Sequence, residues 1–131
     1  GHPMITPADF MRFPAEDRVV ALDAFRRHLA RLLLAEAAVQ IRRLLPSAAW
    51  IKVRHPDHGD DLGPVLRGVV DLVSIRDAGG YSLGPVGPVA ALPITVLLCD
   101  VQRIYPGLLG APGPDDPRVV RVDLPPAPPT R

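Results

Sequence analysis

The 131-residue sequence contains one cysteine, one lysine and no asparagine, and aromatic residues make up only 5% of it. A lone cysteine, Cys99, excludes a disulfide bond within the chain. The shortage of aromatic residues requires a core built from aliphatic side chains. Arginine supplies nearly all of the basic side chains and stands beside abundant Ala, Pro, Gly and Val, so we attribute its excess to a GC-rich genome and not to function.

Neither sign of charge dominates, since 15 basic and 14 acidic side chains leave a formal net charge of +1. This balance argues against a dedicated nucleic-acid-binding protein and gives no sign of attachment to a membrane surface. The sequence also shows no secretory signal and no apolar run of the ~20 residues that cross a bilayer. We therefore expect a cytoplasmic protein.

The length and the 47% hydrophobic content fit one globular domain. Residues 1–3, which precede Met4, are interpreted as the remnant of an expression tag. A lead punctuated by prolines follows over 4–14, and the single α+β domain spans 15–124. The proline-rich segment 125–131 is expected to be a flexible tail.

A stretch without proline between Pro14 and Pro46 predicts one long helix that begins near Ala15. About 30 residues in a helix correspond to a length of roughly 45 Å. Such a helix is long for a domain of this size, so its apolar positions indicate what it packs against.

The apolar residues of this helix change face halfway along it. One side of the first half carries Leu22, Phe25, Leu29, Leu32 and Leu33. The apolar residues of the second half, rotated by roughly a quarter turn or more, are Leu34, Ala37, Ile41, Leu44 and Leu45. Either the helix bends around its own core, or it covers two surfaces, of which the second belongs to another copy of the chain.

The remaining elements follow from hydrophobic periodicity. Alternation and apolar runs predict strands over 47–54, 65–76, 81–83 and 118–124. A helical period predicts a second helix over 93–105 with Pro93 in its first turn, and the β-branched residues at its start leave a strand as the alternative. The order α-β-β-β-α-β and the turn signal at 77–80 predict an α+β fold, in which the long N-terminal helix packs on a small, mainly antiparallel sheet.

One loop carries residue types that bind metals. His55, Asp57, His58 and Asp60 follow the first predicted strand, and imidazole and carboxylate are ligands for zinc, manganese or iron. Metal sites usually draw their ligands from several rigid elements, whereas these residues share a single loop with Gly and Pro. A solvated turn is the alternative, and we expect neither a metal nor a cofactor.

No catalytic residue can be named from the sequence. Cys99 has no identifiable histidine partner and is expected to be half-buried in the second helix. Asp71 interrupts an apolar strand, so it either faces inward or lies across from Lys52 or Arg54. The sequence contains no phosphate-binding glycine loop and no CxxC, HExxH or GxSxG motif.

Two groups of residues are candidates for binding a ligand or partner. Trp50, expected to be exposed, lies beside Lys52 and Arg54 on the first strand and forms a plausible interaction surface. Arg27 and Arg31 share one side of the long helix, where they either meet an acidic or phosphate-bearing partner or form a solvated face.

The layout resembles a group of small uncharacterised actinobacterial α+β proteins, often encoded among mobile-element or regulatory genes. The segments that carry the resemblance are LLPSAAWIKV at 44–53 and VVDLVSIRDAGG at 69–80, and it covers residues 15–109. The resemblance implies the order of elements and the type of host, and it implies no activity.

These observations favour a non-catalytic interaction module whose partner is another protein or a second copy of the chain. Self-association would use the long helix, the sheet or both. The alternative is a small enzyme or ligand-binding protein with a pocket between the long helix and the sheet, with the 55–61 loop as a metal site.

Overall fold

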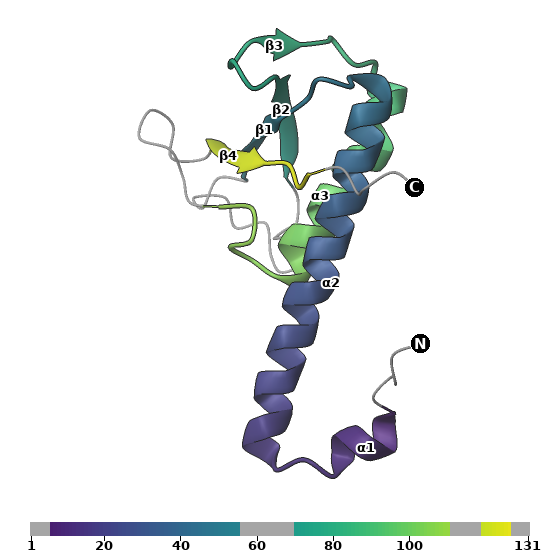
Figure 1. The fold of residues 1–131 in the computed structure, drawn as a ribbon, viewed down its shortest axis with the longest axis vertical. Coiled ribbons are helices and arrows are strands. Elements are labelled where there is room, and N and C mark those ends of the chain that lie inside the picture. Colours follow the sequence, from purple (N-terminus) through teal and green to yellow (C-terminus); the bar gives the residue numbers. More distant parts are fainter. Residues whose placement is uncertain (1–5, 56–69, 111–118, 127–131) are drawn as a thin grey trace, which may run out of the picture.

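The computed structural model describes residues 6–55, 70–110 and 119–126, which form a sheet layer and a helix layer (Figure 1). The elements are α1 (Pro7–Met11), α2 (Ala15–Leu44), β1 (Trp50–Arg54), β2 (Asp71–Arg76), β3 (Ser82–Leu83), α3 (Pro88–Ile104) and β4 (Val119–Asp123). The predicted α+β fold and its order of elements are confirmed, and α1 is an additional short helix within the lead.

The four strands form one antiparallel sheet in the order β3-β2-β1-β4. The central strand β1 pairs with β2 and β4, and its register with β2 shifts between Lys52 and Val53. Ile51 and Val53 are fully buried, whereas the intervening residues lie on the other face. Strand alternation therefore leaves one face of the sheet on the core and the other open.

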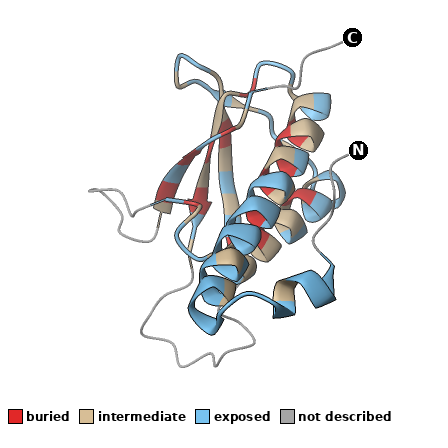
Figure 2. Ribbon diagram, turned by 60° about the horizontal axis from the view of Figure 1, so that its bottom comes forward, coloured by how far each residue is buried: buried red, intermediate tan, exposed pale blue. Residues whose placement is uncertain are grey.

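The core lies between this sheet and the two long helices. The buried residues of α2 are Ala30, Leu34, Ala37, Ala38 and Ile41, and those of α3 are Ile94, Leu98 and Val101 (Figure 2). The alanines let α2 approach its neighbours closely. All five buried positions of α2 lie in its C-terminal half, so only that half of the helix contributes to the core.

The N-terminal half of α2 extends away from the rest of the domain (Figure 1). Leu22, Phe25 and Leu29 are exposed there, Leu32 is exposed just beyond it at the start of the C-terminal half, and only Leu33 of the predicted apolar side contacts the core. Of the two alternatives for the change of face, a helix bent around its own core does not describe this half. The change of face instead separates a core-facing half from a half whose apolar side nothing in the described chain covers.

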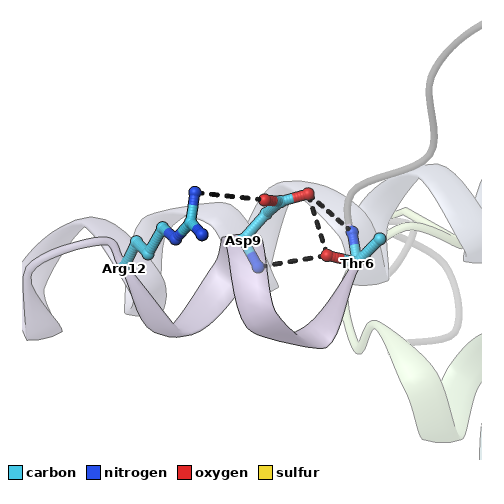
Figure 3. Close-up of polar contacts among 3 residues, drawn as sticks. All are labelled: Thr6, Asp9 and Arg12. Atoms are coloured by element: carbon cyan, nitrogen blue, oxygen red, sulfur yellow. Dashed lines mark hydrogen bonds and ion pairs between the residues drawn. The ribbon is translucent and has the colours of Figure 1, made fainter.

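α1 precedes α2 and lies on the other side of it from the sheet (Figure 1). A capping box begins α1, because the Thr6 hydroxyl accepts from the Asp9 N–H at 3.1 Å and the Asp9 carboxylate accepts from the Thr6 N–H at 3.4 Å (Figure 3). Arg12 lies 3.8 Å from the same carboxylate. The lead therefore contains a locally stabilised turn of helix.

α3 is a helix, so the strand alternative for 93–105 is wrong, and it begins at Pro88 instead of Pro93. Pro88 occupies the first turn, where its missing N–H costs nothing, and Gly87 precedes it as the N-cap. Pro93 lies inside the helix. Two prolines were each compatible with a helix start, and the apolar pattern did not distinguish them.

The strands are shorter than predicted, but the ladder extends past β1. Ala49 donates to the Arg76 carbonyl at 2.8 Å and accepts from the Leu124 N–H at 3.1 Å. The predicted strand residues 65–69 and 118, and the tail beyond 126, lie outside the described residues. None of the helices described here combines the length and apolar character needed to span a membrane.

Candidate interaction surfaces

A line of four exposed apolar side chains runs along α2 from its N-terminal half to the start of its C-terminal half, and we call it the α2 stripe: Leu22, Phe25, Leu29 and Leu32. They are 49%, 66%, 39% and 53% exposed. Their spacing is i, i+3, i+7 and i+10, the alternating three-and-four pattern of a helix that packs along another helix. Exposed apolar side chains scattered singly are ordinary, but a contiguous line of them marks an interaction surface.

A basic and an acidic residue stand at the two ends of the α2 stripe. Continuing the same spacing leads to Arg18 before Leu22 and to Glu36 after Leu32. The Arg18 Nη1 donates to the Met11 sulfur at 3.5 Å, while its Nε is buried without a hydrogen-bond partner in the described structure. Glu36 accepts from Gln40 at 3.3 Å. The apolar α2 stripe is therefore flanked by a basic residue at one end and by an acidic residue at the other.

Two arginines of α2 bind the end of α3. Arg26 donates from Nε and Nη2 to the Ile104 carbonyl at 3.0 and 2.7 Å, where the last turn of α3 leaves an unpaired acceptor. Arg27 donates to the Tyr105 hydroxyl at 3.1 and 2.8 Å and lies 5.3 Å from the centre of its ring. These contacts join α2 to α3 at the point beyond which α2 continues alone.

The hydrogen bond to the Tyr105 hydroxyl raises the pKa of the Arg27 guanidinium above its ordinary value. A raised pKa gives a stabilisation that is complete below the ordinary arginine value and is lost only above it. Arg27 therefore adds no pH dependence to folding near neutrality.

The arginines of α2 have different surroundings. Of the predicted pair, Arg27 has an intramolecular partner in Tyr105, and Arg42, which was not part of that pair in the sequence prediction, donates to the carbonyls of Ala48 and Pro125. Arg31 is exposed and has no polar partner among the described residues. The structure thus gives two of these side chains a role in holding the chain together.

The open face of the sheet carries the other predicted group. Trp50, Lys52 and Arg54 alternate along β1 on the face away from the helices. Trp50 is half-buried, so the expectation of an exposed ring is wrong. The guanidinium groups of Arg121 and Arg76, from the two flanking strands, lie 4.3 and 5.7 Å from the ring centre. Such cation–π contacts cover an aromatic ring.

The sequence reasoning missed Arg76 and Arg121 because their place depends on strand register. Trp50 pairs with Arg76 on β2, and Lys52 pairs with Arg121 on β4. Arg121 also lies 3.0 Å from Asp123 on the same strand. Asp71 is exposed and is the register partner of Arg54 on β1. It therefore lies across from Arg54 in the sheet and does not face the core. The face is therefore of mixed charge.

The two predicted groups do not form one site. The buried residues Ile51 and Val53 separate the open face of β1 from the helix layer, which carries Arg27 and Arg31. A partner that bound Trp50 would not reach the α2 arginines. The structure instead offers two distinct surfaces, the open sheet face and the α2 stripe.

Of the candidate metal loop, only His55 belongs to the described residues. His55 is half-buried, whereas Asp57, His58 and Asp60 lie outside the described residues. Within the described ranges, no three His, Cys, Asp or Glu side chains are grouped as metal ligands. Cys99 is half-buried as predicted, and its sulfur accepts from the Val70 N–H at 3.4 Å and donates to the Val70 carbonyl at 3.5 Å.

Comparison of the chain with protein-family models, with curated proteins and with solved structures gave no match.

Proposed function

We propose that this chain is a non-catalytic interaction module that self-associates through the α2 stripe. The observation that carries the proposal is the exposure of four large apolar side chains, spaced alternately by three and four residues, of which three lie on the half of α2 that extends beyond the core. Burying apolar surface is worth about 25 cal/mol per Å². A partner that covers the stripe would gain this stabilisation.

A second copy of the chain is the occupant that the surface fits best. Side chains spaced alternately by three and four residues fill the holes of a facing helix with the same spacing. An isologous contact uses one patch on both subunits, so the patch must complement itself. The α2 stripe meets this requirement through its apolar side chains and through the opposite charges of the two residues that flank it, Arg18 and Glu36.

The open sheet face is the less favoured surface for self-association. Arg121 and Arg76 already cover the Trp50 ring, and Asp123 neutralises Arg121. A partner would have to displace these contacts before it reached the aromatic surface. We therefore assign the partner to the helix layer.

The non-catalytic part of the proposal is supported by the separation of reactive groups among the described residues. The Cys99 thiol is engaged with the Val70 backbone, His28 is exposed on α2, and Asp71 lies on the sheet opposite Arg54. Catalysis requires such groups to converge within hydrogen-bond reach. A cytoplasmic setting, where a lone cysteine stays reduced, is part of the same proposal.

The test is the molar mass by light scattering across a micromolar concentration series. The wild-type chain should pass from monomer to dimer as its concentration rises. The Phe25→Glu and Leu29→Glu variants should remain monomeric, because each places a charge within the α2 stripe. Val20→Glu is the matched control, since Val20 is 69% exposed on α2 but off the stripe. A wild-type monomer at every concentration, or equal dissociation by Val20→Glu, would overturn the proposal.

A further inference from the structure

We infer that the two copies pair with their α2 helices antiparallel, with the twofold axis passing beside residue 27. The inference rests on the proposed self-association and specifies its geometry. It follows from an internal symmetry of the α2 stripe, in which residues of matching character lie at equal sequence distances on either side of that point.

This symmetry relates all four residues of the α2 stripe in pairs. Leu22 lies five residues before residue 27 and Leu32 five residues after it, so these two leucines face each other across the interface. Phe25 lies two residues before and Leu29 two residues after, so each phenylalanine meets a leucine at the centre. Because both are large apolar side chains, an antiparallel pairing matches apolar with apolar along the whole stripe.

The charged ends distinguish the antiparallel from the parallel arrangement. Arg18 lies nine residues before residue 27 and Glu36 nine residues after it, so each Arg18 faces Glu36 of the other copy. In a parallel pair the same positions would place Arg18 against Arg18 and Glu36 against Glu36, which is repulsive.

The residues that flank the α2 stripe on either side of the helix surface are consistent with this register. On one border Ala21 lies diagonally across from Ala35 of the other copy, two residues out of level with it, and these small side chains let the helices approach closely. On the other border Val19 lies diagonally across from Leu33 in the same way, which extends the apolar contact. Arg26 lies near the axis on that border and therefore close to Arg26 of the other copy, and each guanidinium is held on the Ile104 carbonyl of its own chain.

The overall shape also favours the antiparallel order. The N-terminal half of α2 extends alone from the domain, whereas the C-terminal half is backed by the sheet and α3 (Figures 1 and 2). Antiparallel pairing lays the extended half of each copy along the supported half of the other. Both unsupported halves are then braced, which a parallel pair of two extended halves would not achieve.

Disulfide trapping in a Cys99→Ser background tests the register. Leu22→Cys and Leu32→Cys proteins are mixed and oxidised, and we expect one cross-linked species that contains one chain of each variant. Each variant alone should give little cross-linking, because the same residue in the two copies is about 15 Å apart along the axis of an antiparallel pair. Efficient cross-linking of Leu22→Cys to itself, or of no combination while the background protein remains dimeric, would overturn the inference.

Charge reversal supplies a second measurement that leaves the leucines in place. Arg18→Glu and Glu36→Arg should each raise the dimer dissociation constant about two- to tenfold, and the double variant should restore it. In a parallel dimer neither single substitution would weaken pairing, because each replaces one like-charged pair by another. A wild-type chain that never dimerises defeats the proposed function itself, whereas a dimer with the wrong cross-links or without rescue defeats only this register.

Discussion

Trp50 shows how strand register positions single side chains on the open sheet face. Its ring is covered by guanidinium groups from β2 and β4, which are separated from β1 in sequence but adjacent to it in the sheet. Arg121 is the nearer of the two, at 4.3 Å from the ring centre. The half-burial of Trp50 therefore depends on charged neighbours and not on the core.

Removal of Arg121 should uncover the ring. Because Trp50 is the only tryptophan, quenching of its fluorescence by acrylamide reports this ring alone. We expect Arg121→Ala to increase the quenching constant relative to wild type. Arg54→Ala is the control, since Arg54 lies on the same face without covering the ring. An equal effect of both substitutions would contradict a specific contact between Arg121 and Trp50.

The turn between β2 and β3 requires glycine at one of its two glycine positions. Gly80 has a φ of +88°, a conformation that L side chains rarely adopt, and its N–H donates to the Asp77 carbonyl at 3.0 Å. Gly80→Ala should lower the free energy of unfolding by about 1 kcal/mol, measured by urea denaturation. Gly79→Ala should cost less, because Gly79 has no positive φ and its nearest neighbour is the exposed Tyr81 ring. Equal losses would contradict this account.

At the scale of elements, α2 was predicted more accurately than α3. Pro14 and Pro46 enclose a stretch without any helix breaker, and the observed helix, Ala15–Leu44, fills almost all of it. The segment of α3 contains both Pro88 and Pro93, and either proline suits a first turn. Its C-terminal end depends on Arg26 and Arg27 of another element, which no local sequence signal indicates.

The contact of Arg26 with α3 gives a prediction at this scale. The Ile104 carbonyl accepts two hydrogen bonds from one charged group, and charge-assisted hydrogen bonds are stronger than neutral ones. Arg26→Ala should lower the free energy of unfolding by about 1 kcal/mol in urea denaturation at fixed protein concentration. Arg31→Ala, on the same helix but without a polar partner in the described part of the chain, should change it by less than about 0.5 kcal/mol. Similar losses of unfolding free energy in both variants would argue against a stabilising contact between Arg26 and the end of α3.

The candidate site was only partly predictable for a related physical reason. The change of apolar face along α2 is a local pattern, so the sequence could indicate a second surface. Which half of the helix stays exposed depends on where the sheet and α3 end, and that is a tertiary property. The cover on Trp50 likewise depends on the pairing of distant strands, so the sequence alone wrongly suggested a free aromatic ring.

At the scale of the whole molecule, the domain is a two-layer body from which half of a helix extends. An isolated helix of that length is marginal in water, because helix stability in proteins comes mainly from packing of an apolar face. The Arg26 and Arg27 contacts anchor the extended half where it leaves α3, and the residues before them have only α1 as a neighbour in the described chain. Pairing with a second copy would supply the missing packing.

If unfolding is coupled to dissociation, the melting temperature must rise with protein concentration. We expect an increase of about 2–4 °C for each tenfold increase in wild-type concentration, followed by Trp50 fluorescence, because the sheet that carries Trp50 lies away from the α2 stripe. Leu29→Glu should melt at a temperature independent of concentration, whereas Val20→Glu should behave as wild type. A wild-type melting temperature that does not change with concentration would show that the extended half of α2 is stable unpaired, and the packing argument would then fail.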